Sequence, residues 1–261
     1  MRINANGITF NCKIEGREGA PWLVFSNSLA TNISMWDPQA ADLNASFRVL
    51  RYDQRGHGGT DAPPGRYSFA MLITDAIALM DALDIDRAHF VGLSMGGATA
   101  LGLAKLHPDR FDRVVVSDSP CMSTPQSMAQ WEERIALAQA NGMAALVEPT
   151  IARWFPPETY AANPPHLDRV REMIRTTPLD GFIGCAAALA DHDYNSAVAT
   201  VTRPVLFMVG SKDGTTPNAM KDMQARLKGS RYVELDGAGH IANLDRSTEF
   251  TGAVREFLGA P

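Results

Sequence analysis

The sequence predicts an α/β fold, in which a mostly parallel central sheet is flanked by helices and carries an inserted helical cap. Short apolar runs alternate with helical patterns in the first 120 residues and again after residue 193, which is typical of buried parallel strands joined by helices. Between these parts, residues 121–193 contain helical patterns and no strand signal. We therefore expect a core domain of residues 1–120 and 194–261 and a helical cap of residues 121–193.

The predicted elements follow one another in order. The first strand is expected after an Asn6-Gly7 turn, and the helix after the fourth strand ends before Pro108. Strands are predicted over residues 10–15, 22–25, 47–52, 89–92, 114–116, 204–209 and 231–235. Helices of the core are predicted over residues 67–83, 98–107 and 248–258. In the cap, we expect helices that are broken at Pro149, at residues 156–157 and 164–165, and at Pro178.

The composition excludes several kinds of partner and cofactor. The 24 basic and 29 acidic side chains leave a net charge of −5, so neither nucleic acid nor an anionic membrane is an expected partner. No stretch approaches the roughly 20 apolar residues of a membrane span, and no apolar leader follows Met1. The three cysteines and the histidines fit no metal or redox spacing, and no dinucleotide loop occurs. We expect a cytoplasmic protein with reduced thiols, no cofactor and no metal, and the sequence leaves a homo-oligomer open.

Gly92-Leu93-Ser94-Met95-Gly96 fits the pattern G-x-S-x-G, which is typical of the nucleophile elbow of α/β-hydrolases. There the serine occupies a sharp turn between a strand and a helix, and the glycines avoid a collision across that turn. A predicted strand precedes the motif here, and a predicted helix follows it. The other interpretation, a plain glycine-rich turn, leaves the partner residues described next without a role. We predict that Ser94 is a nucleophile.

A serine hydroxyl needs a base to become nucleophilic, and the chain has six histidines. His240 follows the predicted strand 231–235 within the turn Gly237-Ala238-Gly239-His240, where a loop can bring an imidazole over the edge of the sheet. In this fold the chain order is nucleophile, acid, histidine. His240 is the only histidine after the last credible acid, which favours it as the base over a solvated loop histidine.

The third member of the triad orients the imidazole. Asp213 follows the predicted strand 204–209 at its carboxyl end, which is the edge where active sites of open α/β sheets gather. Asp118 occupies a similar position after strand 114–116 and is the rival acid. Chain order and loop setting favour Asp213.

Two backbone N–H groups should stabilise the oxyanion of the tetrahedral state. One is expected from Met95, the residue after the nucleophile, and the other from the loop after strand 22–25. That loop has the sequence Ser-Asn-Ser-Leu over residues 26–29, where His-Gly is more usual. Counting back from the tryptophan that follows places the second donor at Leu29. The side chains of Asn27 and Ser28 are candidates for additional support.

A run of the form D-x-R-G-x-G, residues 53–58, directly follows strand 47–52. We interpret this run as architectural, because such a segment shapes a loop beneath the site. His57 is then an orienting or packing group rather than a base.

Beyond these motifs, the whole chain resembles the 3-oxoadipate enol-lactonases, hydrolases of the β-ketoadipate route of aromatic breakdown. The likeness is most specific in residues 26–29, in the Met-Trp-Asp-Pro-Gln run of residues 35–39, and in the cap segment of residues 175–187. The resemblance implies hydrolysis of 3-oxoadipate enol-lactone, a five-membered lactone with an acetate arm, to 3-oxoadipate. Ser94 would form an acyl-enzyme, with His240 and Asp213 as its partners.

The implied lactone substrate carries a carboxylate, which needs a cation or several donors. Arg134 and Arg153, each near a cap tryptophan, are candidates, and the alternative for both is a solvated surface position. Trp131 and Trp154 either line the pocket or belong to the core of the cap. Ser28 is a further candidate contact with the substrate.

Other functions stay open at the level of sequence. A broad-specificity carboxylesterase or perhydrolase would use the same triad, and a comparison of substrates discriminates it from a lactonase. A non-catalytic small-molecule binding protein on the same fold is disfavoured by the intact set Ser94, Asp213 and His240. A dehalogenase needs a carboxylate nucleophile where this chain has Ser94.

Overall fold

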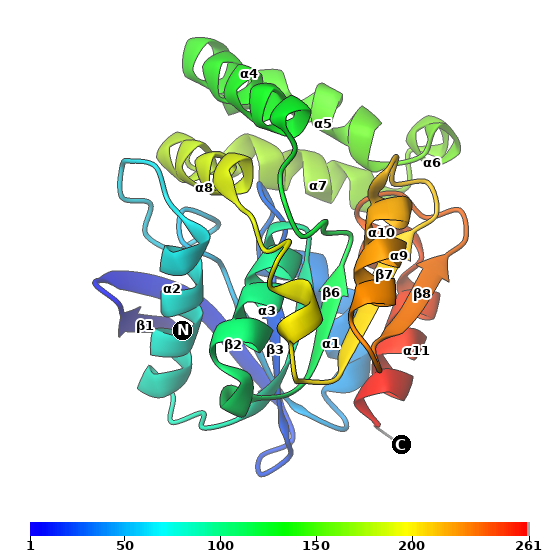
Figure 1. Cartoon of the computed structure of the whole chain (residues 1–261). Helices are drawn as coiled ribbons and strands as arrows, with labels where there is room; N and C mark the ends of the chain where they lie inside the picture. The colour runs from blue at the N-terminus through cyan, green and yellow to red at the C-terminus, as the bar shows by residue number, and fades with distance from the viewer. Residues whose placement is uncertain (260–261) are drawn as a thin grey trace.

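An eight-stranded sheet forms the centre of the molecule (Figure 1). The computed structural model describes residues 1–259, and its strands run in the order β1-β2-β4-β3-β5-β6-β7-β8 across the sheet. The strands are β1 (Arg2–Ala5), β2 (Ile8–Gly16), β3 (Trp22–Ser26), β4 (Arg48–Tyr52), β5 (Ala88–Leu93), β6 (Phe111–Ser117), β7 (Val205–Gly210) and β8 (Arg231–Leu235). Pairs β1–β2 and β2–β4 are antiparallel and all other pairs are parallel. The predicted mostly parallel sheet is confirmed.

Helices cover both faces of the sheet. The α-helices are α1 (Asp37–Leu43), α2 (Phe69–Ala82), α3 (Met95–Leu106), α4 (Pro125–Asn141), α5 (Val147–Trp154), α6 (Pro157–Ala162), α7 (Pro165–Thr176), α8 (Leu179–Asp191), α9 (Thr216–Arg226), α10 (Ala242–Asp245) and α11 (Ser247–Leu258). Short 3-10 turns are η1 (Ile33–Trp36), η2 (Pro108–Arg110), η3 (Met143–Leu146) and η4 (Val198–Thr200). Among residues 1–259, none of the helices is both long and apolar enough to cross a membrane.

The core lies in two hydrophobic clusters on opposite faces of the sheet. In β3, Leu23 and Phe25 belong to one cluster and Val24 to the other, as the two-residue period of a strand requires. Helices α2, α3 and α9 pack mainly against the face of Val24, and α1 and α11 against the opposite face. Burial of both faces explains why the parallel strands are continuous apolar runs in the sequence.

The cap helices α4 to α8 stand together at one end of the sheet (Figure 1). The chain enters and leaves this part through two adjacent segments that are joined by a bridge between Met122 and Asp193. The Tyr194 N–H donates to the Cys121 carbonyl oxygen at 2.7 Å, and the Ser123 N–H donates to that of His192 at 2.9 Å. On this basis we propose that residues 121–193 form a helical cap inserted into the core domain of residues 1–120 and 194–261.

Prolines mark helix starts in the cap. Pro125, Pro157 and Pro165 are the first residues of α4, α6 and α7, and Pro178 directly precedes α8. The expectation that Pro149 breaks a helix is wrong, because Pro149 is the third residue of α5. A proline is tolerated in the first turn, where its missing N–H would have had no helical acceptor.

Strand β1 and the helices α1, α9 and α10 were not predicted from the sequence. Strand β1 pairs with β2 across the Asn6-Gly7 turn, in which both residues have positive φ, 45° and 75°, as in tight hairpins. With four residues at the sheet edge, β1 has no long apolar run. Helix α3 begins at Met95 rather than at residue 98, so the nucleophile lies directly against its start.

The three cysteines, Cys12, Cys121 and Cys185, are buried free thiols. Burial raises the pKa of each thiol above its usual value. Because the thiolate is the reactive form, these side chains are poor nucleophiles. They contribute to packing and not to the site.

Candidate active site

Ser94 occupies the sharp turn between β5 and α3. Its φ is 56°, a left-handed value that costs a non-glycine residue about 1–3 kcal/mol. A Cβ on Gly92 would collide with the carbonyl of Gly96, and a Cβ on Gly96 would collide with that of Ser26. The G-x-S-x-G pattern therefore reflects backbone crowding around the serine.

The three residues of the predicted triad lie in one hydrogen-bonded chain. His240 Nε2 lies 2.9 Å from Ser94 Oγ, and His240 Nδ1 lies 2.8 Å from Asp213 Oδ2. When Nδ1 carries the proton and donates it to the carboxylate, Nε2 is free to accept the serine hydroxyl. This arrangement can remove a proton from Ser94 and return it to a leaving group.

The loops of Asp213 and His240 are tied to each other and to the cap. The Lys212 N–H donates to the Ala238 carbonyl oxygen at 2.8 Å, and the His240 N–H donates to the Trp154 carbonyl oxygen at 2.7 Å. A Cβ on Gly239 would collide with that same Trp154 carbonyl. The end of cap helix α5 thus helps to position the histidine.

Asp118, the rival acid, lies at the end of β6 and forms no hydrogen bond with His240 within the described chain. Its Oδ1 accepts the Gly210 N–H at 2.8 Å, and its Oδ2 accepts the Ser117 hydroxyl at 2.6 Å. Burial and, second, the charge of Asp213 raise the pKa of the Asp118 carboxyl well above its ordinary value. The structure therefore brings Asp213, and not Asp118, to the imidazole.

The two predicted oxyanion donors, Leu29 and Met95, come from neighbouring segments. Met95 is the first residue of α3, so its N–H has no acceptor in a preceding helical turn. The loop after β3 passes over this helix start, because a Cβ on Gly96 would meet the backbone of Ser26 and Asn27. Among residues 1–259, neither predicted N–H donates to a protein acceptor. Both donors are thus available to a bound oxyanion.

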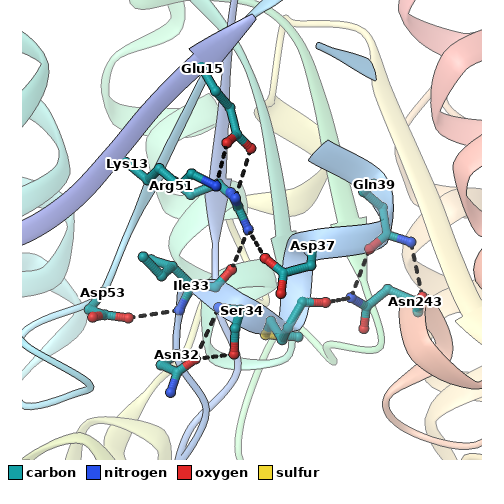
Figure 2. Close-up of polar contacts among 11 residues, drawn as sticks. Lys13, Glu15, Asn32, Ile33, Ser34, Asp37, Gln39, Arg51, Asp53 and Asn243 are labelled. Carbon is teal, nitrogen blue, oxygen red and sulfur yellow. Dashed lines mark hydrogen bonds and ion pairs between the residues drawn. The ribbon is translucent and has the colours of Figure 1, made fainter. Parts of the chain in front are cut away.

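A buried polar network fixes the segment that follows this loop (Figure 2). Arg51, which is 2% exposed, donates to the Ile33 carbonyl oxygen at 3.0 Å and pairs with Asp37 and Glu15 at 2.5 and 2.7 Å. The Ile33 N–H donates to Asp53 Oδ1 at 2.7 Å. The loop that carries Leu29 is therefore anchored on its carboxyl side.

Asn243 joins the same segment to the loop of the histidine (Figure 2). Its side-chain Nδ2 donates to the Met35 carbonyl oxygen at 2.7 Å, and its backbone carbonyl oxygen accepts from Gln39 Nε2 at 2.9 Å. The base and the oxyanion loop therefore share one support. Sequence reasoning missed it, because Gln39 and Asn243 are 204 positions apart and neither lies in a recognisable motif.

His57 is fully buried and lies beside the oxyanion loop. Its Nδ1 lies 3.1 Å from the Arg55 carbonyl oxygen, and its Nε2 accepts the Ala30 N–H at 2.9 Å. Burial lowers the pKa of the imidazole to about 4, against a smaller opposing effect of the Arg55 carbonyl. Both ring nitrogens are engaged away from Ser94, which agrees with an orienting role and not with that of a base.

The two tryptophans of the cap make separate aromatic contacts, one with the catalytic histidine and one with two arginines. Trp154 is buried and stacks on His240, with ring centroids 5.9 Å apart. The guanidinium carbons of Arg134 and Arg153 lie 4.8 and 5.6 Å from the ring centroid of Trp131. Arg134 is half-buried with a fully buried Nη1, which does not fit a solvated surface position, whereas Arg153 is exposed and does fit one.

Neither of these two arginines has a carboxylate partner in an ion pair within residues 1–259. Arg134 Nη2 donates to Thr150 Oγ1 at 2.9 Å. Burial and, second, the charge of Arg153 lower the pKa of Arg134 to about 9. Partial desolvation also lowers the pKa of Arg153, which the charge of Asp213 partly opposes. Two like charges held over the same tryptophan ring are unfavourable alone, so this region of the cap favours an anion.

Three of the predicted substrate contacts carry buried polar atoms that have no partner in the described part of the chain. These atoms are Ser28 Oγ, Trp154 Nε1 and Arg134 Nη1. An unpaired buried polar group costs about 1–3 kcal/mol, which a polar ligand could recover. Over the same residues, no group of three or more His, Cys, Asp or Glu side chains could hold a metal ion.

Comparisons with known proteins agree with the fold. Residues 21–247 match the family model for the alpha/beta hydrolase fold. The chain is 35% identical to 3-oxoadipate enol-lactonase 1 of Acinetobacter baylyi, over 99% of this chain and 96% of that protein. It is 32% identical to 3-oxoadipate enol-lactonase 2 of the same organism, over 98% and 95%. The crystal structure of the enol-lactonase from Burkholderia xenovorans LB400 superimposes with a TM-score of 0.95 at 38% identity, covering 99% of this chain and 100% of that one.

Proposed function

The chain belongs to the α/β-hydrolase family and, within it, to the 3-oxoadipate enol-lactonases, and on that premise we propose that it converts 3-oxoadipate enol-lactone to 3-oxoadipate. It is a hydrolase of lactone or ester bonds. The observation that carries the proposal is the hydrogen-bonded chain from Ser94 through His240 to Asp213. The triad adjoins the cap, because the His240 N–H donates to the Trp154 carbonyl oxygen. Within residues 1–259, the cap holds two arginines that form no ion pair with a carboxylate.

In the first half of the proposed reaction, Ser94 Oγ attacks the ring carbonyl carbon while His240 Nε2 takes the serine proton. The carbonyl oxygen becomes an oxyanion that accepts hydrogen bonds from the N–H groups of Met95 and Leu29. Asp213 stabilises the imidazolium that forms. The tetrahedral state then collapses, the ring C–O bond breaks, and the oxygen leaves as an enol with the proton from His240.

In the second half, His240 removes a proton from water, and the resulting hydroxide attacks the acyl carbon on Ser94. Collapse of this second tetrahedral state breaks the bond to Ser94 Oγ, which recovers its proton from the imidazolium. The free carboxylic acid retains the enol, which tautomerises to the ketone of 3-oxoadipate. An enol is a better leaving group than an alkyl alcohol, so acylation is favourable.

The acetate arm of the lactone is proposed to bind at Arg134 and Arg153. A carboxylate there would pair with the half-buried guanidinium of Arg134 and the exposed one of Arg153, and charge-assisted hydrogen bonds are the stronger kind. The charge of Asp213 opposes the lowering of the Arg153 pKa, which supports a position of this subsite within electrostatic reach of the triad. Trp131, Trp154 and Ser28 are proposed to complete the pocket.

The substrate proposal is tested by measuring kcat/KM for the enol-lactone and for p-nitrophenyl esters. A lactonase should prefer the enol-lactone by orders of magnitude, because its remote carboxylate contributes transition-state binding. Ser94→Ala is the control and should lose activity on both. A preference for p-nitrophenyl esters would make the chain a broad carboxylesterase, and tight lactone binding without turnover would make it a binding protein.

The proposed setting of the enzyme is the cytoplasm, where thiols stay reduced, as the three free cysteines suggest. Its proposed partner is the small carboxylate-bearing lactone, with no nucleic acid or membrane. A homo-oligomer is not required, because the triad and the arginines all come from one chain.

A further inference from the structure

We propose that His57 is a positioning residue that sets the direction of the oxyanion donor in the loop after β3. The proposal rests on the serine-hydrolase function above and goes beyond it, because it assigns a role to a group outside the triad. His57 forms no hydrogen bond with Ser94, His240 or Asp213 within the described chain. Among residues 1–259, the hydrogen bond that links the imidazole to the site joins its Nε2 to the N–H of Ala30, the residue after the predicted donor Leu29.

The loop that carries the donor is a four-residue turn. The Thr31 N–H donates to the Ser28 carbonyl oxygen at 3.3 Å, with Leu29 and Ala30 at the centre. Ala30 has a φ of 56°, whereas Leu29 is not among the residues with positive φ. These signs are those of a type II turn, in which the third residue is usually glycine. An alanine there favours the type I alternative, in which the central peptide is rotated.

His57 holds that central peptide. The Ala30 N–H belongs to the peptide between Leu29 and Ala30, and it donates to His57 Nε2 at 2.9 Å. In a type I turn the same N–H would point away from the imidazole, so the hydrogen bond would be lost. The contact with His57 therefore offsets the strain at Ala30 and selects the type II form.

Other contacts hold the Ser28 carbonyl oxygen and the end of the loop at Thr31. Asn27 Nδ2 donates to the carbonyl oxygens of Ser28 and Thr31, each at 3.0 Å, and Thr31 Oγ1 donates to Ser28 at 2.8 Å. None of these bonds involves the central peptide. The Ser28 carbonyl oxygen belongs to the same peptide as the Leu29 N–H, so these bonds hold the peptide of the donor and His57 holds the next one. Rotation of the central peptide would change the Leu29 backbone between the two and misalign the donor. An error of about 1 Å in such a position can reduce the rate a hundredfold.

The imidazole is suited to this task because it has one fixed state. With Nδ1 donating to the Arg55 carbonyl oxygen at 3.1 Å, Nε2 carries the lone pair that the Ala30 N–H needs. Full burial keeps the ring neutral. A protonated ring would present a second donor to Ala30 and break the bond.

The test compares His57→Phe, which removes the acceptor, with His57→Gln, whose amide oxygen can still accept the Ala30 N–H. We expect His57→Phe to lower kcat for p-nitrophenyl acetate by about tenfold to a hundredfold with little change in KM. His57→Gln should retain most of the rate. Thermal melting confirms that each variant is folded.

Ala30→Gly supplies the decisive second measurement. Glycine adopts positive φ without strain, so His57→Phe/Ala30→Gly should recover much of the lost kcat. If the imidazole of His57 contributed only packing, the Ala30→Gly substitution would not restore the lost kcat. If His57→Phe does not fold, Ala30→Pro removes the same N–H and imposes negative φ with the imidazole in place, and it should show the same loss.

The outcomes separate the two proposals. If the wild-type protein turns over neither p-nitrophenyl acetate nor the enol-lactone, the hydrolase function itself is overturned. Wild-type turnover together with unchanged kcat in folded His57→Phe, or in Ala30→Pro, would overturn the positioning role alone. Equal losses in His57→Phe and in its Ala30→Gly double variant would do the same.

Discussion

At the scale of single residues, two aspartates that follow adjacent strands have different environments. Asp213 accepts from His240 Nδ1, whereas Asp118 is occupied by Gly210 and Ser117. We expect Asp213→Asn to lower kcat about 10⁴-fold, because an amide favours the wrong tautomer of the histidine. Asp118→Asn is the matched control and should keep kcat within the same order of magnitude. Steady-state kinetics on the enol-lactone measures both, and the reverse ranking would make Asp118 the acid.

The arginine pair gives a second residue-scale prediction. Arg134→Met keeps the length of the side chain and removes the charge that we assign to the substrate carboxylate. Loss of a charge-assisted hydrogen bond costs about 1.5–3 kcal/mol, so KM for the enol-lactone should rise about tenfold or more. KM for p-nitrophenyl acetate, which has no free carboxylate, should stay unchanged.

Arg175→Met is the control for this experiment, because Arg175 is half exposed and paired with Glu172 within α7. It should leave both KM values as in the wild type. Equal effects of Arg134→Met on the two substrates would indicate a structural role for Arg134 and place the carboxylate elsewhere.

At the scale of elements, cap helix α8 packs directly on the loop that follows β4. A Cβ on Gly181 would collide with the backbone of Gly56, and a Cβ on Gly184 would meet the ring of Tyr67. The glycines of the segment 175–187, which the sequence analysis noted only through resemblance, therefore have a packing reason. They let the cap approach the run of residues 53–58.

This contact predicts the effect of adding one methyl group. Gly181→Ala must push backbone away from backbone, and overpacking of this kind costs about 1–3 kcal/mol. We expect a lower free energy of unfolding in urea and a higher KM, because the cap shifts over the triad. Gly252→Ala is the matched control in α11, where the added Cβ meets nothing within 4 Å. The control should stabilise the protein by about 0.5–1 kcal/mol. An unchanged free energy of unfolding and KM in Gly181→Ala would show that the backbone of residue 56 can move to accept the added methyl group.

The elements that sequence could predict are those whose pattern comes from burial. Strands with both faces covered are continuous apolar runs, so β3 and β7 were found close to their observed bounds. Helices α1 and α9 each begin with a proline in the first two positions and have few apolar residues. Strand β1 lies at the edge of the sheet, where it pairs with a single neighbouring strand and has no fully buried residue. Their positions depend on tertiary contacts that no local pattern records.

At the scale of the whole molecule, the site was predictable as far as its chemistry constrains the sequence. The elbow around Ser94 needs glycines, and chain order selects Asp213 and His240. The left-handed φ of Ala30 and its bond to His57 were not predictable, because nothing in the residue types indicates a turn form. The pairing of Asn243 with Gln39 depends on how α10 and α1 approach each other, which only the folded chain determines.

Buried neutral histidines give the last prediction, the response of the whole fold to acid. Burial lowers the pKa of His57 from 6.5 to about 4, so between these pH values the unfolded chain binds a proton that the folded chain does not. The contribution of His57 to the free energy of unfolding is therefore fully present above pH 6.5. It falls by about 3 kcal/mol as the pH drops toward 4. Urea unfolding at pH 7.5, 6 and 5 measures the fall. His57→Gln cannot take up this proton, so its decline should be shallower, and parallel curves for the two proteins would show that His57 titrates normally.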